Sequence, residues 1–170
     1  FWNLVYAVGI GLVLASLVFM KKIGDVSAKR SKLVPLGNAD EFGLPWQDEK
    51  NFPQYLKEEV FIKRLDGPLF FGNTSDFQEL AKGIPATATH LIIRMGKVPY
   101  MDQSGLYAME ETLLRLRQGK IKIILVSLQK QPKVMMQSID IIPDLVPEKR
   151  LVGTFKEAME YIRKNVEDVV

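Results

Sequence analysis

The first twenty residues of this chain contain no charged side chain. The segment from Phe1 to Met20 reads FWNLVYAVGIGLVLASLVFM, and Lys21 and Lys22 follow it directly. A helix of about 20 apolar residues, rising about 1.5 Å per residue, crosses a hydrocarbon layer about 30 Å thick. We therefore expect residues 1–22 to form one transmembrane helix, with the lipid bilayer as a partner.

A signal peptide or a buried core helix would fit this segment less well. A signal peptide begins with a basic region and has a short apolar core, whereas this segment begins Phe1-Trp2-Asn3 and its apolar run is longer. A helix buried in a soluble protein usually carries a polar face, and here the polar positions are Asn3, Tyr6 and Ser16. Because the chain does not begin with Met, we expect it to be part of a longer protein.

Small residues recur along one side of the expected membrane helix. Ala7, Gly11 and Ala15 follow each other at a spacing of four, which places them on one helical face. Such a face lets another helix approach closely in a membrane. The alternative is exposure to lipid with a chance placement of small residues. We favour packing against further transmembrane helices.

The charges beside the apolar segment predict its orientation. Five basic residues follow it closely and only Asp25 opposes them: Lys21, Lys22, Lys29, Arg30 and Lys32. Positive flanks remain cytoplasmic, so we expect the chain in the inner membrane with its C-terminal part in the cytoplasm. Residues 1–32 carry a formal charge of +4 and the rest of the chain −1, so the net +3 comes from this flank. This distribution argues against a nucleic-acid partner, and the absence of cysteine fits a cytoplasmic domain.

A connector and one soluble domain are expected after the membrane helix. Residues 31–53 contain three prolines, two glycines and no sustained hydrophobic period, which is typical of a connection with local turns. We assign residues 23–54 to a cytoplasmic linker. Residues 55–170 are long enough for one hydrophobic core and too short for two.

Strands and helices alternate through residues 55–170. Apolar runs predict strands, and apolar residues at i, i+3, i+4 and i+7 predict helices. The alternation indicates an α/β domain with a mixed, largely parallel sheet and flanking helices. The expected strands are 59–66, 69–71, 90–96, 121–127 and 149–152; the expected helices are 75–84, 106–116, 134–139 and one that begins after Thr154.

One loop of this domain is a candidate regulatory site. It follows the strand 90–96, at the carboxyl end of the sheet where α/β domains place functional loops, and it contains Asp102, Ser104 and Gly105. Ser104 falls in the first turn of the next helix, where free N–H groups and the helix dipole favour a phosphate. The simpler interpretation is that Asp102 or Ser104 caps the helix and Gly105 permits a close approach.

No set of residues predicts catalysis or a cofactor. His90 is the single histidine and there is no cysteine, so a catalytic triad and a multi-histidine or thiolate metal site have no basis in the sequence. The glycines do not form a phosphate-binding pattern. We therefore expect no catalytic residue, no metal and no cofactor in this chain.

Several segments of this chain resemble parts of proteins with a STAS domain, the module shared by sulfate permeases and anti-sigma-factor antagonists. The segment VPYMDQSGLYAMEETLLRLRQGKIKIILVSL is similar to its core, with Asp102, Ser104 and Gly105 at the D-x-[ST]-G turn. RLDGPLFFGN, residues 64–73, resembles the hairpin of bacterial SulP transporters. YAVGIGLVLASLVFMKK and DVSAKR are similar to the last membrane helix of those transporters and its exit.

The resemblance implies the C-terminal part of a SulP-type transporter for an anion such as sulfate or bicarbonate. The residues that bind the transported anion would lie upstream of Phe1. The STAS domain would be a non-catalytic regulatory and assembly module, with the upstream membrane bundle as partner and a second STAS domain or a regulatory protein as further candidates. The alternative is a membrane-tethered switch resembling an anti-sigma-factor antagonist, in which Ser104 accepts a phosphate and the turn binds a kinase or regulator.

Overall fold

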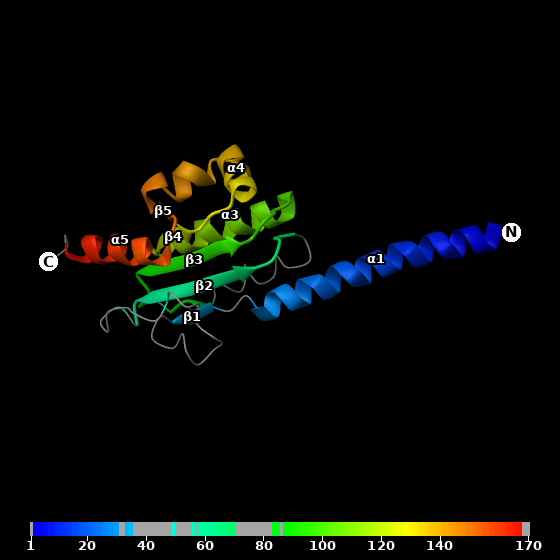
Figure 1. The fold of residues 1–170 in the computed structure, drawn as a ribbon, viewed down its shortest axis with the longest axis horizontal. Coiled ribbons are helices and arrows are strands. Elements are labelled where there is room, and N and C mark those ends of the chain that lie inside the picture. Colours follow the sequence, from blue (N-terminus) through cyan, green and yellow to red (C-terminus); the bar gives the residue numbers. More distant parts are fainter. Residues whose placement is uncertain are drawn as a thin grey trace.

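A long helix and an α/β domain make up the part of the chain described by the computed structural model (Figure 1). The described residues are 2–30, 33–35, 49, 56, 58–70, 83–85 and 87–167. The helix precedes the domain in the sequence and projects away from its sheet.

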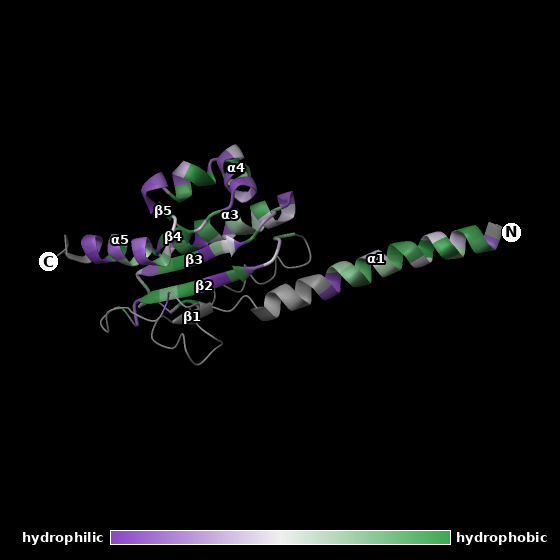
Figure 2. Cartoon of the chain, viewed as in Figure 1, coloured by the Kyte–Doolittle hydropathy of each residue, from purple (hydrophilic) through white to green (hydrophobic). Residues whose placement is uncertain are grey.

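Helix α1, Trp2–Arg30, contains the expected membrane span. The window Asn3–Lys22 has a mean hydropathy of 2.1, and none of it is buried against the domain. Within the described residues it is the one helix long and apolar enough to cross a membrane, and Figure 2 shows this hydrophobic stretch as a largely green segment. A core helix of a soluble protein would be mostly buried, so the exposure favours a lipid-facing role.

The sheet has five strands in the order β1-β2-β3-β4-β5. The edge strand β1, Leu33–Pro35, runs antiparallel to β2, Val60–Asp66. Strands β2 to β5 are parallel to each other. Strand β3 is His90–Lys97, β4 is Lys122–Val126 and β5 is Leu151–Val152. The expected α/β architecture with a mixed, largely parallel sheet is confirmed.

Helices cover both faces of this sheet. Helices α3, Gln103–Gln118, and α4, Lys130–Ser138, lie over one face, and α5, Phe155–Glu167, lies over the other (Figure 1). Two short turns, η5 at Ile141–Leu145 and η6 at Glu148–Arg150, connect α4 to β5. Both faces are covered, as expected for parallel strands, which need crossover connections.

Alternate strand residues enter two hydrophobic clusters. Leu91 and Ile93 of β3 belong to the cluster that includes the apolar side of α3, whereas Ile92 belongs to the cluster under α5. All three are fully buried. The apolar runs of β3 and β4 therefore reflect burial on two faces rather than alternation between core and solvent.

Helix α3 has the apolar stripe that its sequence predicts. Leu106, Met109, Leu113 and Leu116 are all buried. The exposed pair Glu111–Arg115, with Oε1 and Nη2 2.7 Å apart, lies on its solvent side. Periodicity therefore located this helix and its buried face correctly.

The expected capping box of the last helix is also present. The backbone N–H of Glu157 donates to Oγ1 of Thr154 at 3.2 Å, and the Glu157 carboxylate accepts from the N–H of Gly153 at 2.9 Å. The Gly153 bond, and next the Thr154 hydroxyl, which donates to Oε1 of Glu157 at 3.0 Å, lower the pKa of Glu157 below its ordinary value. The motif thus satisfies N–H groups at the start of α5.

Some elements differ from the sequence prediction. Strand β1 lies inside the segment expected to be a linker, and α4 begins at Lys130, four residues earlier than expected. Pro132 falls in the first turn of α4, where a missing N–H costs nothing. Of the expected strand 69–71, Leu69 forms a single bridge to Met101. Most of the expected helix 75–84 lies outside the described residues.

Candidate functional site

The two sequence motifs that identify the domain touch each other. Leu69, from the GPLFFG segment, forms a parallel bridge with Met101, which precedes the D-x-[ST]-G turn. The N–H of Leu69 donates to the carbonyl of Tyr100, and the N–H of Asp102 donates to the carbonyl of Leu69, each at 2.9 Å. The loop at the carboxyl end of β3 is therefore held by the segment that follows β2.

Asp102 is the N-cap of α3, as one of the two sequence interpretations expects. Its backbone is extended, and its Oδ1 accepts a hydrogen bond of 2.7 Å from the N–H of Gly105. Its carbonyl accepts the N–H of Leu106 at 2.9 Å, which begins the helix. A side-chain acceptor at this position satisfies a backbone donor that the helix itself leaves unpaired.

Gly105 is required by a close backbone approach. A Cβ atom at this position would lie 2.6 Å from the carbonyl oxygen of Leu69 and 2.9 Å from its carbonyl carbon. Both are backbone atoms held by the hydrogen bond to Asp102, so they have little freedom to move. The glycine of the turn is therefore matched to the Leu69 segment, which connects the two motifs in space.

A glutamine of α4 holds the other side of the loop. Oε1 of Gln131 accepts the N–H of Met101, and its Nε2 donates to the carbonyl of Met101, both at 2.9 Å. The Met101 side chain is fully buried. Sequence reasoning missed Gln131, because its partner is 30 residues away and a glutamine near a helix start has many other roles.

Ser104 lies in the first turn of α3 and is partly buried. Within the residues that the structure describes, its hydroxyl forms no hydrogen bond. The neighbouring tyrosines are exposed, with 53% of Tyr100 and 54% of Tyr107 accessible. A phosphate on Ser104 would meet the positive end of the helix dipole and also the carboxylate of Asp102. The geometry therefore brings Asp102, Ser104 and Gly105 together in one turn.

The remaining candidate, His90, opens β3 as the sequence predicts. It is 3% exposed, and its Nδ1 lies 2.9 Å from Oγ1 of Thr89. Desolvation, together with the charges of Lys122 and Arg150, lowers the pKa of His90 from 6.5 to about 4. Across residues 2–30 and the described parts of the domain, no group of three His, Cys, Asp or Glu residues is arranged to hold a metal ion.

Comparison with protein families gives one match that covers most of the domain. Residues 53–164 fit the model of the STAS domain. This range contains β2 to β5, the Leu69 contact and the whole turn from Asp102 to Gly105. It covers about two thirds of the chain.

A curated relative extends the match beyond that domain. The chain is 25% identical over 139 residues to the putative sulfate transporter YvdB of Bacillus subtilis, which is 79% of this chain and 23% of the relative. Because only six residues follow residue 164, an alignment of this length includes part of the segment before residue 53. The chain spans about a quarter of the length of that transporter.

Solved structures share the fold. A sulfate transporter family protein from Wolinella succinogenes aligns with a TM-score of 0.62 and 24% identity, covering 72% of this chain and 96% of that one. The STAS domain of a SulP transporter from Vibrio cholerae aligns with a TM-score of 0.57 and 24% identity, covering 69% and 88%. At these identities the similarity establishes the fold of the domain.

Proposed function

Because this chain belongs to the STAS domain family, we propose that it is the C-terminal part of a SulP-type anion transporter. In this proposal residues 1–22 are the last transmembrane helix, 23–54 are a cytoplasmic linker and 55–170 are the STAS domain. The transported anion, of the sulfate or bicarbonate type, binds in the membrane bundle upstream of Phe1. The STAS domain lies in the cytoplasm and performs no catalysis.

The observation that carries the proposal is the extent of the match to the sulfate transporter. It includes residues before the domain, on the side where α1 lies, and it leaves about three quarters of the relative unmatched. A soluble STAS protein would not need the apolar window Asn3–Lys22. Together these features support a membrane bundle that precedes this chain.

The role proposed for the domain is regulation and assembly. A domain can bias a transport cycle only if it contacts the membrane part differently in two of its states. The loop at the carboxyl end of β3 suits such a contact, because Leu69 and Gln131 hold its backbone while Tyr100 and Tyr107 remain exposed. The upstream bundle is the proposed partner, and a second STAS domain is a further one.

Anion uptake by the full-length protein in proteoliposomes tests this function. The intact transporter is compared with a form that ends at residue 54, after equal insertion has been verified. We expect uptake by the truncated form to fall by about fivefold or more, the lower range of a coupling between two sites. Equal uptake would contradict the regulatory role. A start codon immediately before Phe1 would contradict the transporter assignment itself.

A second function is supported by the position of Ser104. In the alternative, the chain is a membrane-tethered switch whose turn binds a kinase or regulator. A phosphate at Ser104 would add about 1.5 to 2 negative charges beside two exposed tyrosines. Replacing Ser104→Asp should then weaken one specific partner, while Ser104→Ala retains it. Equal binding by the unmodified chain and both variants would exclude the switch.

A further inference from the structure

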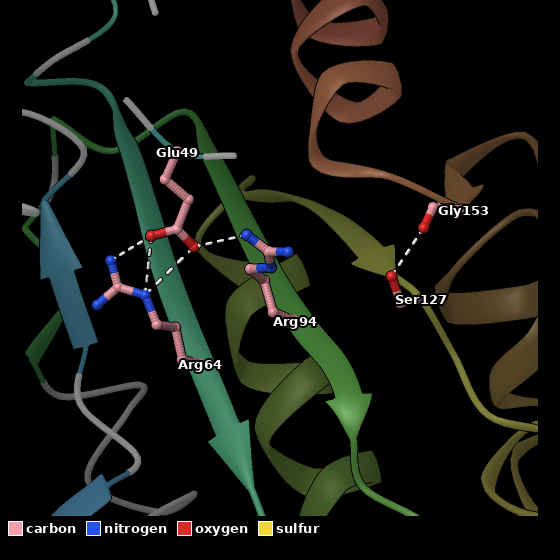
Figure 3. Close-up of polar contacts among 5 residues, drawn as sticks. All are labelled: Glu49, Arg64, Arg94, Ser127 and Gly153. Carbon is pink, nitrogen blue, oxygen red and sulfur yellow. Dashed lines mark hydrogen bonds and ion pairs between the residues drawn. The ribbon is translucent and has the colours of Figure 1, made fainter. Parts of the chain in front are cut away.

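Three charged side chains are buried together on the α5 face of the sheet (Figure 3). Nε of Arg64 donates to both carboxylate oxygens of Glu49, at 2.9 and 3.2 Å, and its terminal Nη2 also contacts this carboxylate. Nη1 of Arg94 donates to Oε1 of Glu49 at 2.8 Å. Glu49 is 1% exposed, Arg64 7% and Arg94 5%.

The two arginines are positioned by the sheet itself. Arg64 of β2 and Arg94 of β3 are register partners in neighbouring parallel strands, so their side chains leave the same face side by side. The guanidinium of Arg94 also lies 5.5 Å from the ring centre of Phe155 in α5. Buried cations are retained in a folded protein only when hydrogen-bonded anions compensate them, and Glu49 supplies such an anion.

Glu49 comes from outside the parallel sheet. It belongs to the segment between β1 and β2, which follows α1 and then β1 in the chain. Within the described residues, strand β1 has three residues and pairs with β2 alone, and so short an edge strand is a weak attachment. Leu56, 2% exposed and packed in the cluster under α5, follows on the same face.

We propose that Glu49 is an ionic latch that fixes the connection between β1 and β2 to the sheet through Arg64 and Arg94, and so reinforces the short β1 pairing by which the chain after α1 is attached. With the latch closed, α1, β1 and the domain move as one body, and a movement of the membrane helix reaches the sheet. With the latch open, the attachment after α1 is weaker, because it relies on the three register pairs between β1 and β2. The latch rests on the proposed membrane location of α1, but it does not depend on which anion is transported, because all of its residues lie within this chain.

The absence of cysteine in this chain permits a direct test. Lys22→Cys at the exposed end of the membrane window and Lys156→Cys on α5, whose side chain is 84% exposed, provide two spin-label sites. The full chain is placed in lipid nanodiscs and the distance between the labels is measured by pulsed electron resonance. We expect one narrow distance distribution, and loss of it in Glu49→Gln, which keeps the shape and removes the charge.

A matched control separates the latch from ordinary ion pairs. Glu111→Gln removes a carboxylate from the exposed pair with Arg115, and it should leave the distribution narrow. Hydrogen exchange monitors the fold in parallel. In Glu49→Gln, amides of α3 and β4 should keep the protection of the parent chain. If the amides of α3 and β4 lose protection in Glu49→Gln, the network stabilises the whole core, and the latch proposal is overturned.

A second variant covers the case in which Glu49→Gln does not fold because it leaves buried charges uncompensated. The combination Glu49→Ala, Arg64→Met and Arg94→Met removes the whole network and leaves no unpaired charge, a change that folded proteins tolerate. We expect this variant to fold and to show a broad distance distribution. A narrow distribution in either folded variant would overturn the proposal.

Discussion

At the scale of single residues, Gly105 determines whether the turn and the Leu69 segment can lie together. We expect Gly105→Ala to lower the free energy of unfolding by about 1–3 kcal/mol, because the new Cβ would overlap backbone atoms. Urea unfolding of the detergent-solubilised chain measures the loss. Gly119 provides the control: its φ is −74° and a Cβ there would be 3.4 Å from the nearest atom. A Gly105→Ala loss no larger than that of Gly119→Ala would contradict the packing.

His90 predicts how the stability of the domain depends on pH. Burial, with Lys122 and Arg150 nearby, lowers the pKa of His90 from 6.5 to about 4. The unfolded chain therefore binds a proton more readily than the folded chain between these values. The contribution of neutral His90 is fully present above about pH 6.5 and decreases as the pH falls toward 4, by about 3 kcal/mol in total.

The His90→Gln variant isolates that contribution from the carboxylates, which also titrate in acid. The free energy of unfolding should decrease less steeply from about pH 6.5 to about pH 4.5 in the variant than in the parent chain. The difference between the two slopes is the measured quantity, so a constant loss of stability in the variant does not affect it. Parallel slopes would show that His90 is not responsible.

At the scale of elements, Gln131 of α4 fixes the loop before α3. Replacing Gln131→Leu removes both bonds to Met101 and leaves a buried N–H and carbonyl unsatisfied, which costs about 1–3 kcal/mol. Gln131→Glu retains the acceptor for the Met101 N–H and should lose less. Hydrogen exchange of the Met101 amide is the local measurement, with exposed Gln137 substituted by Leu as the control.

The Gln137→Leu control also defines the result that would contradict the role of Gln131 in holding the loop. Opening of the Met101 amide should become faster in Gln131→Leu and remain unchanged in Gln137→Leu. If both variants protect Met101 as the parent chain does, the loop is held by the Leu69 segment alone.

The elements that the sequence predicted correctly are those whose position is determined by local residue patterns. The buried stripe of α3 repeats with the helical period and consists of Leu106, Met109, Leu113 and Leu116. The cap of α3 is also local, because Asp102 accepts the N–H of Gly105, three residues further on. Strand β1 escaped prediction because a three-residue edge strand exists only through its pairing with β2. Local propensity has little influence on such pairing.

The buried ion network escaped prediction for a similar reason. Arg94 interrupts the apolar run of β3, where a charge needs a buried partner, whereas Arg64 follows Lys63 in a strand that ends in Asp66. Which carboxylate approaches the two arginines depends on the long connection between β1 and β2, and no local pattern identifies Glu49. The sequence thus indicates Arg94 but not the latch.

At the scale of the whole molecule, the structure combines a helix exposed along its apolar window with a domain whose core is closed. Residues Asn3–Lys22 are unburied, whereas the strands β2, β3 and β4 are buried on both faces. By its length and composition, this helix could cross a membrane. The family match of residues 53–164 and the match to the sulfate transporter support the arrangement proposed above, a membrane protein with its STAS domain in the cytoplasm.

Labelling of a single introduced cysteine tests that arrangement most directly. Lys156→Cys lies on the exposed side of α5 in a chain without other cysteines, and the protein is expressed in the inner membrane of spheroplasts. A maleimide that does not cross membranes should label the site only after the spheroplasts are opened, and the chain should remain with the membrane fraction. Labelling of intact spheroplasts, or recovery of the chain in the soluble fraction without detergent, would contradict the account.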